Sequence, residues 1–183
     1  MKRDLFTIPN ALSVLRILLV LPFLEAVFSG RADGRWWGLF WLGLAMLTDK
    51  LDGDIARWTH TESEWGRILD PLADKIGVAL VALALLLKGW LPLWFVGVLL
   101  LRDLLILAGG IVIKRKTGEV VPSNMAGKWA VGVIAGTLIV AIIDSTTPWL
   151  SVCIGMSLVM VALSTVGYAK RFMEIMKLRT KNS

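Results

Sequence analysis

Side chains that form covalent cross-links or soft metal sites are almost missing from this sequence. Its 183 residues include one cysteine, Cys153, and one histidine, His60. A single cysteine excludes an intrachain disulfide framework and a thiolate metal cluster. His60 lies in a polar connecting segment, where we interpret it as a solvated loop residue. Ser-His-Asp catalysis and His-rich zinc chemistry are therefore both disfavoured.

Charged residues are also scarce. They make up 19% of the chain, against 56% hydrophobic residues, and the mean hydropathy is +0.71. This composition is too apolar for a soluble domain and predicts one all-α integral-membrane domain over residues 1–183. The net charge of +6 does not indicate a nucleic-acid partner, because basic segments beside a membrane meet anionic lipid headgroups.

Six apolar runs, each near the roughly 20 residues that cross a bilayer, predict six transmembrane helices. They cover residues 10–29, 35–56, 68–89, 91–113, 125–143 and 147–169. We interpret the first run as a retained helix rather than a cleaved signal, because Arg16 interrupts it and further spans follow. Residues 1–7 are predicted to form a short interfacial segment.

Basic residues in the short connections predict the orientation, since Lys and Arg accumulate on the cytoplasmic side. The side that holds both termini carries Lys2, Arg3, Lys114, Arg115, Lys116, Lys170, Arg171, Lys177, Arg179 and Lys181. The other side carries only Arg31, Arg35 and Lys88. Both termini are therefore predicted to be cytoplasmic, in a multi-pass protein of the inner membrane.

Four aspartates stand in a fixed frame between strongly apolar stretches. The frame is Asp49-x2-Asp52-Gly53-x2-Ala56-Arg57-x8-Gly66-x3-Asp70-x3-Asp74. Spacings of three and four residues place its first half on one stripe of one helix, and Asp70 and Asp74 on one stripe of the next. Two acidic faces are expected to converge near the cytoplasmic interface.

Carboxylates beside a membrane core need a chemical reason, because an isolated ionisable group there costs about 3 kcal/mol or more. Structural ion pairs with neighbouring cations are the plainer explanation; the cations are Lys50, Arg57, Arg67 and Lys75. Lys50 and Lys75, however, directly follow aspartates and point away from the acidic stripes. Facing carboxylates repel one another unless cations neutralise them, and an all-oxygen site suits Mg²⁺, Mn²⁺ or Ca²⁺.

The residues between the aspartates indicate a phosphate-bearing ligand as well as a metal. Gly53 and Ala56 lie on the acidic stripe, so a bulky ligand such as a nucleotide can approach the helix backbone there. Arg57 adds a fixed cation for phosphate.

At these positions the chain resembles the CDP-alcohol phosphotransferase family. The family signature, Asp-x2-Asp-Gly-x2-Ala-Arg-x8-Gly-x3-Asp-x3-Asp, is matched at every fixed position, and the family's six-helix core matches the span count. The resemblance implies transfer of a substituted phosphate from a CDP-linked donor to an alcohol, with release of CMP. It also implies dependence on Mg²⁺ or Mn²⁺ in a two-metal site, and a homodimer.

The resemblance also implies roles for individual residues. The metal ligands would be Asp49, Asp52 and Asp70, with Asp74 as a further ligand and the general base. The cytidine diphosphate moiety would contact Asp52, Gly53, Ala56, Arg57 and Gly66.

The start of the chain bears on donor and acceptor. Thr7-Ile8-Pro9-Asn10-Ala11-Leu12-Ser13-x2-Arg16 resembles the opening of bacterial phosphatidylglycerophosphate synthases and related cardiolipin synthases, although an ordinary helix start explains it equally well. This resemblance implies CDP-diacylglycerol as donor and glycerol 3-phosphate as acceptor.

A phosphorylated acceptor requires cations near the aspartates, and three positions are candidates. Lys128 is preferred, in Ser123-Asn124-Met125-Ala126-Gly127-Lys128, which resembles a Gly-Lys of related synthases. Arg115 is explained equally well as an inner-face anchor. Arg102 is explained equally well by an internal ion pair with Asp103.

Several alternatives stay open at this point. A cardiolipin synthase of the same fold would use phosphatidylglycerol as acceptor, and inositol-phosphate or serine transferases are further options within the family. A divalent-cation transporter is the alternative outside enzymes. Gly132-x3-Gly136 is a pattern that lets helices approach closely, either inside the protein or between two copies.

Overall fold

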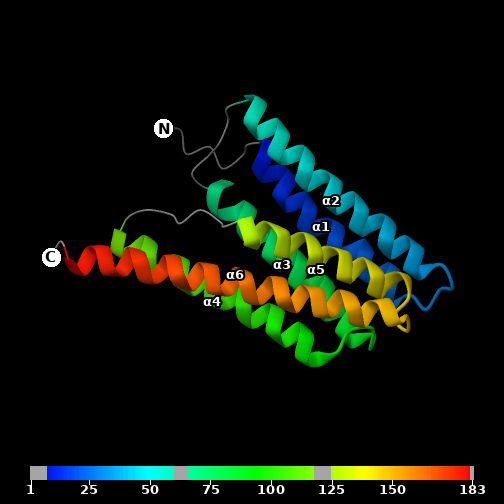
Figure 1. Cartoon of the computed structure of the whole chain (residues 1–183). Coiled ribbons are helices and arrows are strands. Elements are labelled where there is room, and N and C mark those ends of the chain that lie inside the picture. The colour runs from blue at the N-terminus through cyan, green and yellow to red at the C-terminus, as the bar shows by residue number, and fades with distance from the viewer. Residues whose placement is uncertain (1–7, 60–65, 118–124, 182–183) are drawn as a thin grey trace. The chain divides into compact units, whose positions relative to one another are not determined.

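The computed structural model describes residues 8–59, 66–117 and 125–181, and their secondary structure is entirely α-helical (Figure 1). The helices are α1 (Ile8–Phe28), α2 (Gly34–Thr59), α3 (Gly66–Leu87), α4 (Leu93–Thr117), α5 (Met125–Ile143) and α6 (Pro148–Lys181). The prediction of an all-α chain with six helices is confirmed over these residues. The predicted interfacial segment, residues 1–7, lies outside them.

Three of the described helices are long and apolar enough to cross a bilayer. The spanning stretches are Leu93–Ile113, Met125–Ile143 and Pro148–Ile175, while α1 contributes a shorter apolar stretch, Ile17–Phe28. These statements concern the described side chains alone, which in α2 and α3 exclude residues 49–59 and 66–73. Three of the six predicted spans are thus supported, and the other three stay predictions.

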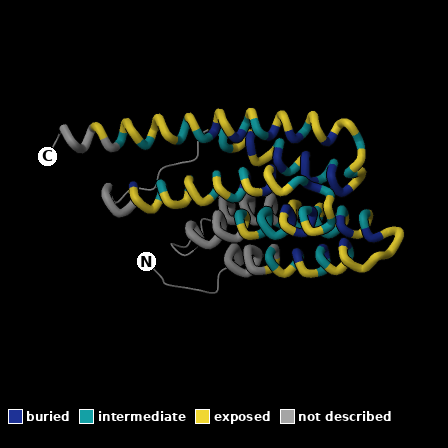
Figure 2. Tube along the Cα trace, turned by 90° about the horizontal axis from the view of Figure 1, so that it is seen from below, coloured by how far each residue is buried: buried dark blue, intermediate teal, exposed yellow. Residues whose placement is uncertain are grey.

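The chain forms two compact units, Met1–Trp90 with α1 to α3 and Leu91–Ser183 with α4 to α6. Each unit has a buried seam of its own, and most other side chains are exposed or half-buried (Figure 2). The single domain expected over residues 1–183 stays a prediction.

Helix α1 is the centre of the first unit, because both α2 and α3 pack against it. Its buried side chains, Val20, Phe23 and Val27, are three or four residues apart and so share one face. Helix α3 adds Val81 and Leu85 to the core.

The contact between α1 and α2 depends on two glycines. A Cβ added at Gly34 would lie 2.5 Å from the carbonyl oxygen of Ala26, and one at Gly38 would lie 3.1 Å from Cγ2 of Val27. Gly34-x3-Gly38 is therefore a small-x3-small contact between neighbouring helices. By contrast, a Cβ added at Gly132 or Gly136 would meet no described atom within 4 Å.

Hence close internal packing is not seen at the Gly132-x3-Gly136 pattern that the sequence singled out. Spacing alone does not say which glycine pair faces another helix. Use of this pattern between two copies stays a prediction.

Helices α1 and α3 end at the same end of the first unit. Two cation–aromatic contacts stabilise this end. Gly89, at φ +71°, turns the chain after α3, and the Trp90 amide donates to the Leu85 carbonyl at 2.8 Å. The Arg35 guanidinium lies 4.2 Å from the centroid of the Trp90 ring. The Lys88 ammonium lies 4.9 Å from that of Phe28. These contacts link the end of α3 to α2 and α1.

In the second unit, α6 packs against both α5 and α4, partly through polar groups. Thr137 Oγ1 and Ser157 Oγ lie 2.8 Å apart in the buried contact between α5 and α6. The Tyr168 hydroxyl donates to the Ile106 carbonyl at 3.2 Å, linking α6 to α4. In lipid, apolar side chains gain little by leaving the acyl chains for another helix, so such hydrogen bonds help to hold the helices together.

The close approach at Gly34 predicts that Gly34→Ala is destabilising. The added methyl group meets a backbone oxygen that cannot rotate away, so we expect a loss of about 1–3 kcal/mol, as for other overpacked sites. Gly43→Ala is the matched control on the same helix, because a Cβ there meets nothing within 4 Å. Thermal unfolding of both variants in one detergent measures the difference. Equal stability of the two variants would contradict the predicted contact.

Candidate functional site

The aspartate motif is divided between two helices of the first unit. Asp49, Asp52, Gly53, Ala56 and Arg57 lie in the last part of α2, and Gly66, Asp70 and Asp74 lie in the first part of α3. Both segments are helical, as the spacing predicted. Their residues therefore fall on the two stripes expected from helical periodicity.

Packing on α1 places both motif segments at the same end of this unit. Gly34 lies beside Ala26 and Gly38 beside Val27 and Phe23, so α2 runs antiparallel to α1. The contact of Lys88 with Phe28 brings the ends of α3 and α1 together, so these two run parallel. The end of α2 and the beginning of α3 thus lie where α1 begins (Figure 1).

Of the eight motif positions, the structure describes the side chain of Asp74 alone. Asp74 is exposed and the following Lys75 is half-buried, and each has an interaction partner. An exposed carboxylate is accessible to a substrate, as a general base must be. Convergence of the two acidic stripes concerns the other side chains and stays a prediction.

The oxygen donors of the motif bear on which metal ion could bind. Among the described side chains, no group of three or more His, Cys, Asp or Glu residues gathers. Asp49, Asp52 and Asp70 lie outside that set. Once the two acidic stripes converge as predicted, the four carboxylates would form an all-oxygen donor set, which would fit a hard divalent cation.

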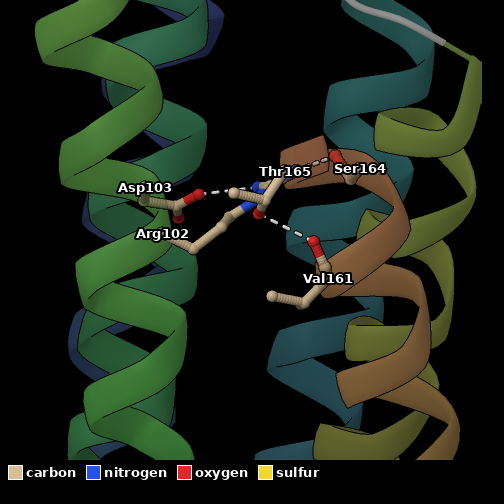
Figure 3. A network of polar contacts seen from close by, with 5 residues as sticks. All are labelled: Arg102, Asp103, Val161, Ser164 and Thr165. Carbon is tan, nitrogen blue, oxygen red and sulfur yellow. Dashed lines mark hydrogen bonds and ion pairs between the residues drawn. The ribbon is translucent and has the colours of Figure 1, made fainter. Parts of the chain in front are cut away.

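Arg102, a candidate for the acceptor site, lies in the apolar part of α4 and is only 11% exposed (Figure 3). Its Nη1 donates to Asp103 Oδ1 at 2.7 Å and its Nη2 to Ser164 Oγ at 3.0 Å. Its Nε is buried without a hydrogen-bond partner among the described residues. The internal ion pair weighed for Arg102 is therefore present, and it extends to α6 through Ser164.

The other two acceptor candidates also belong to the second unit. Lys128 is exposed in the first turn of α5. Arg115 lies in the last turn of α4, where its side chain is outside the described set. A role for Arg102, Arg115 or Lys128 with the aspartates stays a prediction.

Ser164 is a polar partner that sequence reasoning missed. It is 1% exposed and lies 62 positions after Arg102. The signal available was an arginine inside an apolar run, which must find a partner there. Several serines and threonines of the last apolar run qualify equally, so spacing could not identify Ser164.

Comparison with known proteins identifies the family. The sequence model of the CDP-alcohol phosphatidyltransferase family matches residues 6–169, which include the whole aspartate motif. A putative cardiolipin synthase of Mycobacterium tuberculosis is 38% identical over 125 residues, covering 68% of this chain and 58% of that protein.

Two further relatives are named for phosphatidylglycerophosphate synthesis or for the transfer of a phosphatidyl group to glycerol 3-phosphate. A probable phosphatidylglycerophosphate synthase of Mycobacterium tuberculosis is 36% identical over 126 residues, 65% of this chain and 57% of that protein. The CDP-diacylglycerol–glycerol-3-phosphate 3-phosphatidyltransferase of Bacillus subtilis is 31% identical over 145 residues, 69% of this chain and 72% of that protein.

The match spans 58% of the length of the first of these relatives. Three helices able to cross a bilayer, together with the family match, indicate an integral membrane protein. The family match over residues 6–169 and the complete aspartate motif lead to one conclusion: the chain belongs to the CDP-alcohol phosphatidyltransferase family.

Proposed function

We propose that this protein transfers the phosphatidyl group of CDP-diacylglycerol to the hydroxyl of glycerol 3-phosphate, forming phosphatidylglycerophosphate and CMP. The observation that carries the proposal is the complete aspartate motif, on helix segments that packing on α1 brings to one end of the first unit. The names of the Bacillus subtilis and Mycobacterium tuberculosis relatives support the donor and the acceptor.

The motif residues divide into metal ligands and donor contacts. Asp49, Asp52, Asp70 and Asp74 would hold two divalent cations, Mg²⁺ or Mn²⁺, which when bound neutralise charge at the diphosphate. The cytidine diphosphate moiety would contact Asp52, Gly53, Ala56, Arg57 and Gly66. The small side chains of Gly53 and Ala56 let the nucleotide approach α2, and Arg57 offers a cation to phosphate.

Asp74 is assigned the proton transfer. The acceptor hydroxyl oxygen forms a bond to the phosphatidyl phosphorus, and the bond from that phosphorus to the CMP oxygen breaks. The hydroxyl proton passes to the Asp74 carboxylate. This role suits Asp74 because it is exposed, in the first part of α3.

The phosphate of glycerol 3-phosphate needs a cation, and Lys128 is assigned this contact. Its exposed ammonium is accessible to a soluble substrate. Arg115 is a second candidate. Arg102 is the weakest of the three, because Asp103 and Ser164 already accept hydrogen bonds from its guanidinium.

The proposed topology has six spanning helices, both termini in the cytoplasm, residues 1–7 at the interface, and one domain over residues 1–183 in the inner membrane. The aspartates then face the cytoplasm, where soluble glycerol 3-phosphate meets a donor whose acyl chains stay in the bilayer. The basic residues near the termini support this orientation. A homodimer belongs to the same proposal.

A cardiolipin synthase reaction is the second candidate, because the relative that is 38% identical is a putative cardiolipin synthase. Its acceptor would be phosphatidylglycerol. That acceptor carries no phosphate monoester, so Lys128 would lose the role assigned above. The motif's Gly53, Ala56 and Arg57 favour either transferase over a divalent-cation transporter, which has no need of a nucleotide contact.

The direct test supplies each acceptor separately to the purified protein in lipid with CDP-diacylglycerol and Mg²⁺ or Mn²⁺. CMP release and lipid product are measured together. CMP formed only with glycerol 3-phosphate supports the proposal, and CMP formed only with phosphatidylglycerol supports the second candidate. Absence of CMP with every acceptor would overturn both.

Asp74→Asn is expected to lower turnover by about 10²–10⁴-fold, because a carboxamide cannot take the hydroxyl proton. Binding of CDP-diacylglycerol, measured as ligand-induced thermal stabilisation, should be largely retained. Asp33→Asn is the matched control, since Asp33 is an exposed aspartate of the same unit that accepts a hydrogen bond from Trp37 Nε1 at 3.0 Å. Near-native CMP release by Asp74→Asn would remove the assignment.

Lys128→Ala is expected to raise the KM for glycerol 3-phosphate by about tenfold or more, the usual effect of losing a charged hydrogen bond. The KM for CDP-diacylglycerol should change little. Lys128→Arg retains the charge and should recover much of the acceptor affinity. Equal increases in both KM values would argue against a contact with the acceptor phosphate.

A further inference from the structure

The last helix is longer than a membrane crossing requires. Helix α6 has 34 residues, which at 1.5 Å per residue gives about 51 Å, whereas the hydrocarbon core is about 30 Å thick. The apolar run predicted a membrane crossing that ends at residue 169, and the helix itself continues to Lys181. Some three turns therefore extend beyond the hydrocarbon.

The position of this extension follows from the start of α6. Trp149, in the first turn, is 71% exposed and suits the membrane interface, where tryptophan is enriched. A crossing of about 20 residues from there ends near Ala169, so the last residues of the apolar stretch Pro148–Ile175, which is longer than one crossing, would lie at headgroup depth. Beyond Ser164 no described residue of α6 is buried (Figure 2), and Phe172 and Ile175 are half-buried, so the extension is only partly covered by its unit.

The extension, residues 170–181, is strongly basic; we call it the basic segment. Its charged residues are Lys170, Arg171, Glu174, Lys177, Arg179 and Lys181. Lys170 and Lys177 are exposed and seven positions apart, so they share one helix face, on which Glu174 also lies. Exposed Met173 adds an apolar side chain.

We propose that the basic segment binds anionic phospholipids, through their headgroup phosphates, in the leaflet where α6 leaves the bilayer. The segment continues directly from a membrane-crossing stretch, so its first turn is held at headgroup depth. Cations there attract anionic lipids, and the effect fades within a Debye length of the surface. Met173 at the same depth can enter the acyl boundary, as apolar residues of interfacial helices do.

This binding surface does not depend on the proposed catalytic activity. It requires only that α6 crosses the membrane. A soluble acidic partner, such as RNA or an acidic protein, would instead bind the segment equally well in membranes of any lipid composition. Dependence on lipid charge is therefore the observable that separates these partners.

The experiment uses the full chain in nanodiscs, with a fluorophore on Met173→Cys in a Cys153→Ala background. Quenching is compared for acyl-chain spin-labelled phosphatidylserine and spin-labelled phosphatidylcholine at equal mole fraction. Phosphatidylserine is anionic but is neither the donor nor an acceptor proposed above. We expect about twofold or greater preference for phosphatidylserine quenching at low salt, falling at high salt.

Two controls place the effect at the basic segment. The same fluorophore on Leu93→Cys, an exposed position at the start of α4, should show no preference between the two lipids. Lys170→Gln with Lys177→Gln, which halves the net charge of the segment from +4 to +2, should clearly lower the preference at Met173→Cys, whereas Glu174→Gln should increase it. Equal quenching by both lipids at Met173→Cys, or a preference unchanged in the double glutamine variant, would overturn the proposal.

Discussion

The cost of placing charge in a hydrocarbon medium governs where the polar groups of this protein lie. Arg102 lies within an apolar helix, where Asp103 and Ser164 accept its hydrogen bonds and α4 is tied to α6. The motif aspartates instead lie where α2 ends and α3 begins. At the proposed position near the interface, a carboxylate would reach water and cations at a smaller cost than at the centre of a span.

The packing of the first unit, whose helices carry the motif, depends on how closely α1 and α2 approach each other. Gly34 and Gly38 remove the side chains that would separate these helices, and α3 packs against α1 as well. Both halves of the motif are thereby supported by one helix. At the opposite end, the contacts of Arg35 with Trp90 and of Lys88 with Phe28 hold the end of α3 beside α2 and α1.

The ends of α5 and α6 show what an apolar run in the sequence does and does not determine. Helix α5 begins and ends at the predicted residues 125 and 143, because its apolar run determines both ends. Helix α6 continues for twelve residues beyond the predicted membrane crossing, since hydrophobicity marks the crossing and not the end of the helix. The Gly132-x3-Gly136 pattern singled out from the sequence has no described atom within 4 Å of an added Cβ, while Gly34-x3-Gly38 makes a close contact. Local spacing is the same in both cases.

The amino-acid sequence by itself determined the helical and membrane character, the aspartate motif and the family to which the chain belongs. These properties follow from composition, periodicity and fixed spacing, which act over short stretches of chain. Only the tertiary structure decided that α2 and α3, which carry the motif, both pack against α1. It also decided that Ser164, 62 positions later in the chain, accepts a hydrogen bond from Arg102. These contacts between distant residues depend on which helix faces pack together. Many pairings of similar apolar faces bury nearly the same area. The choice among them rests on close contacts between distant residues, which no local pattern records.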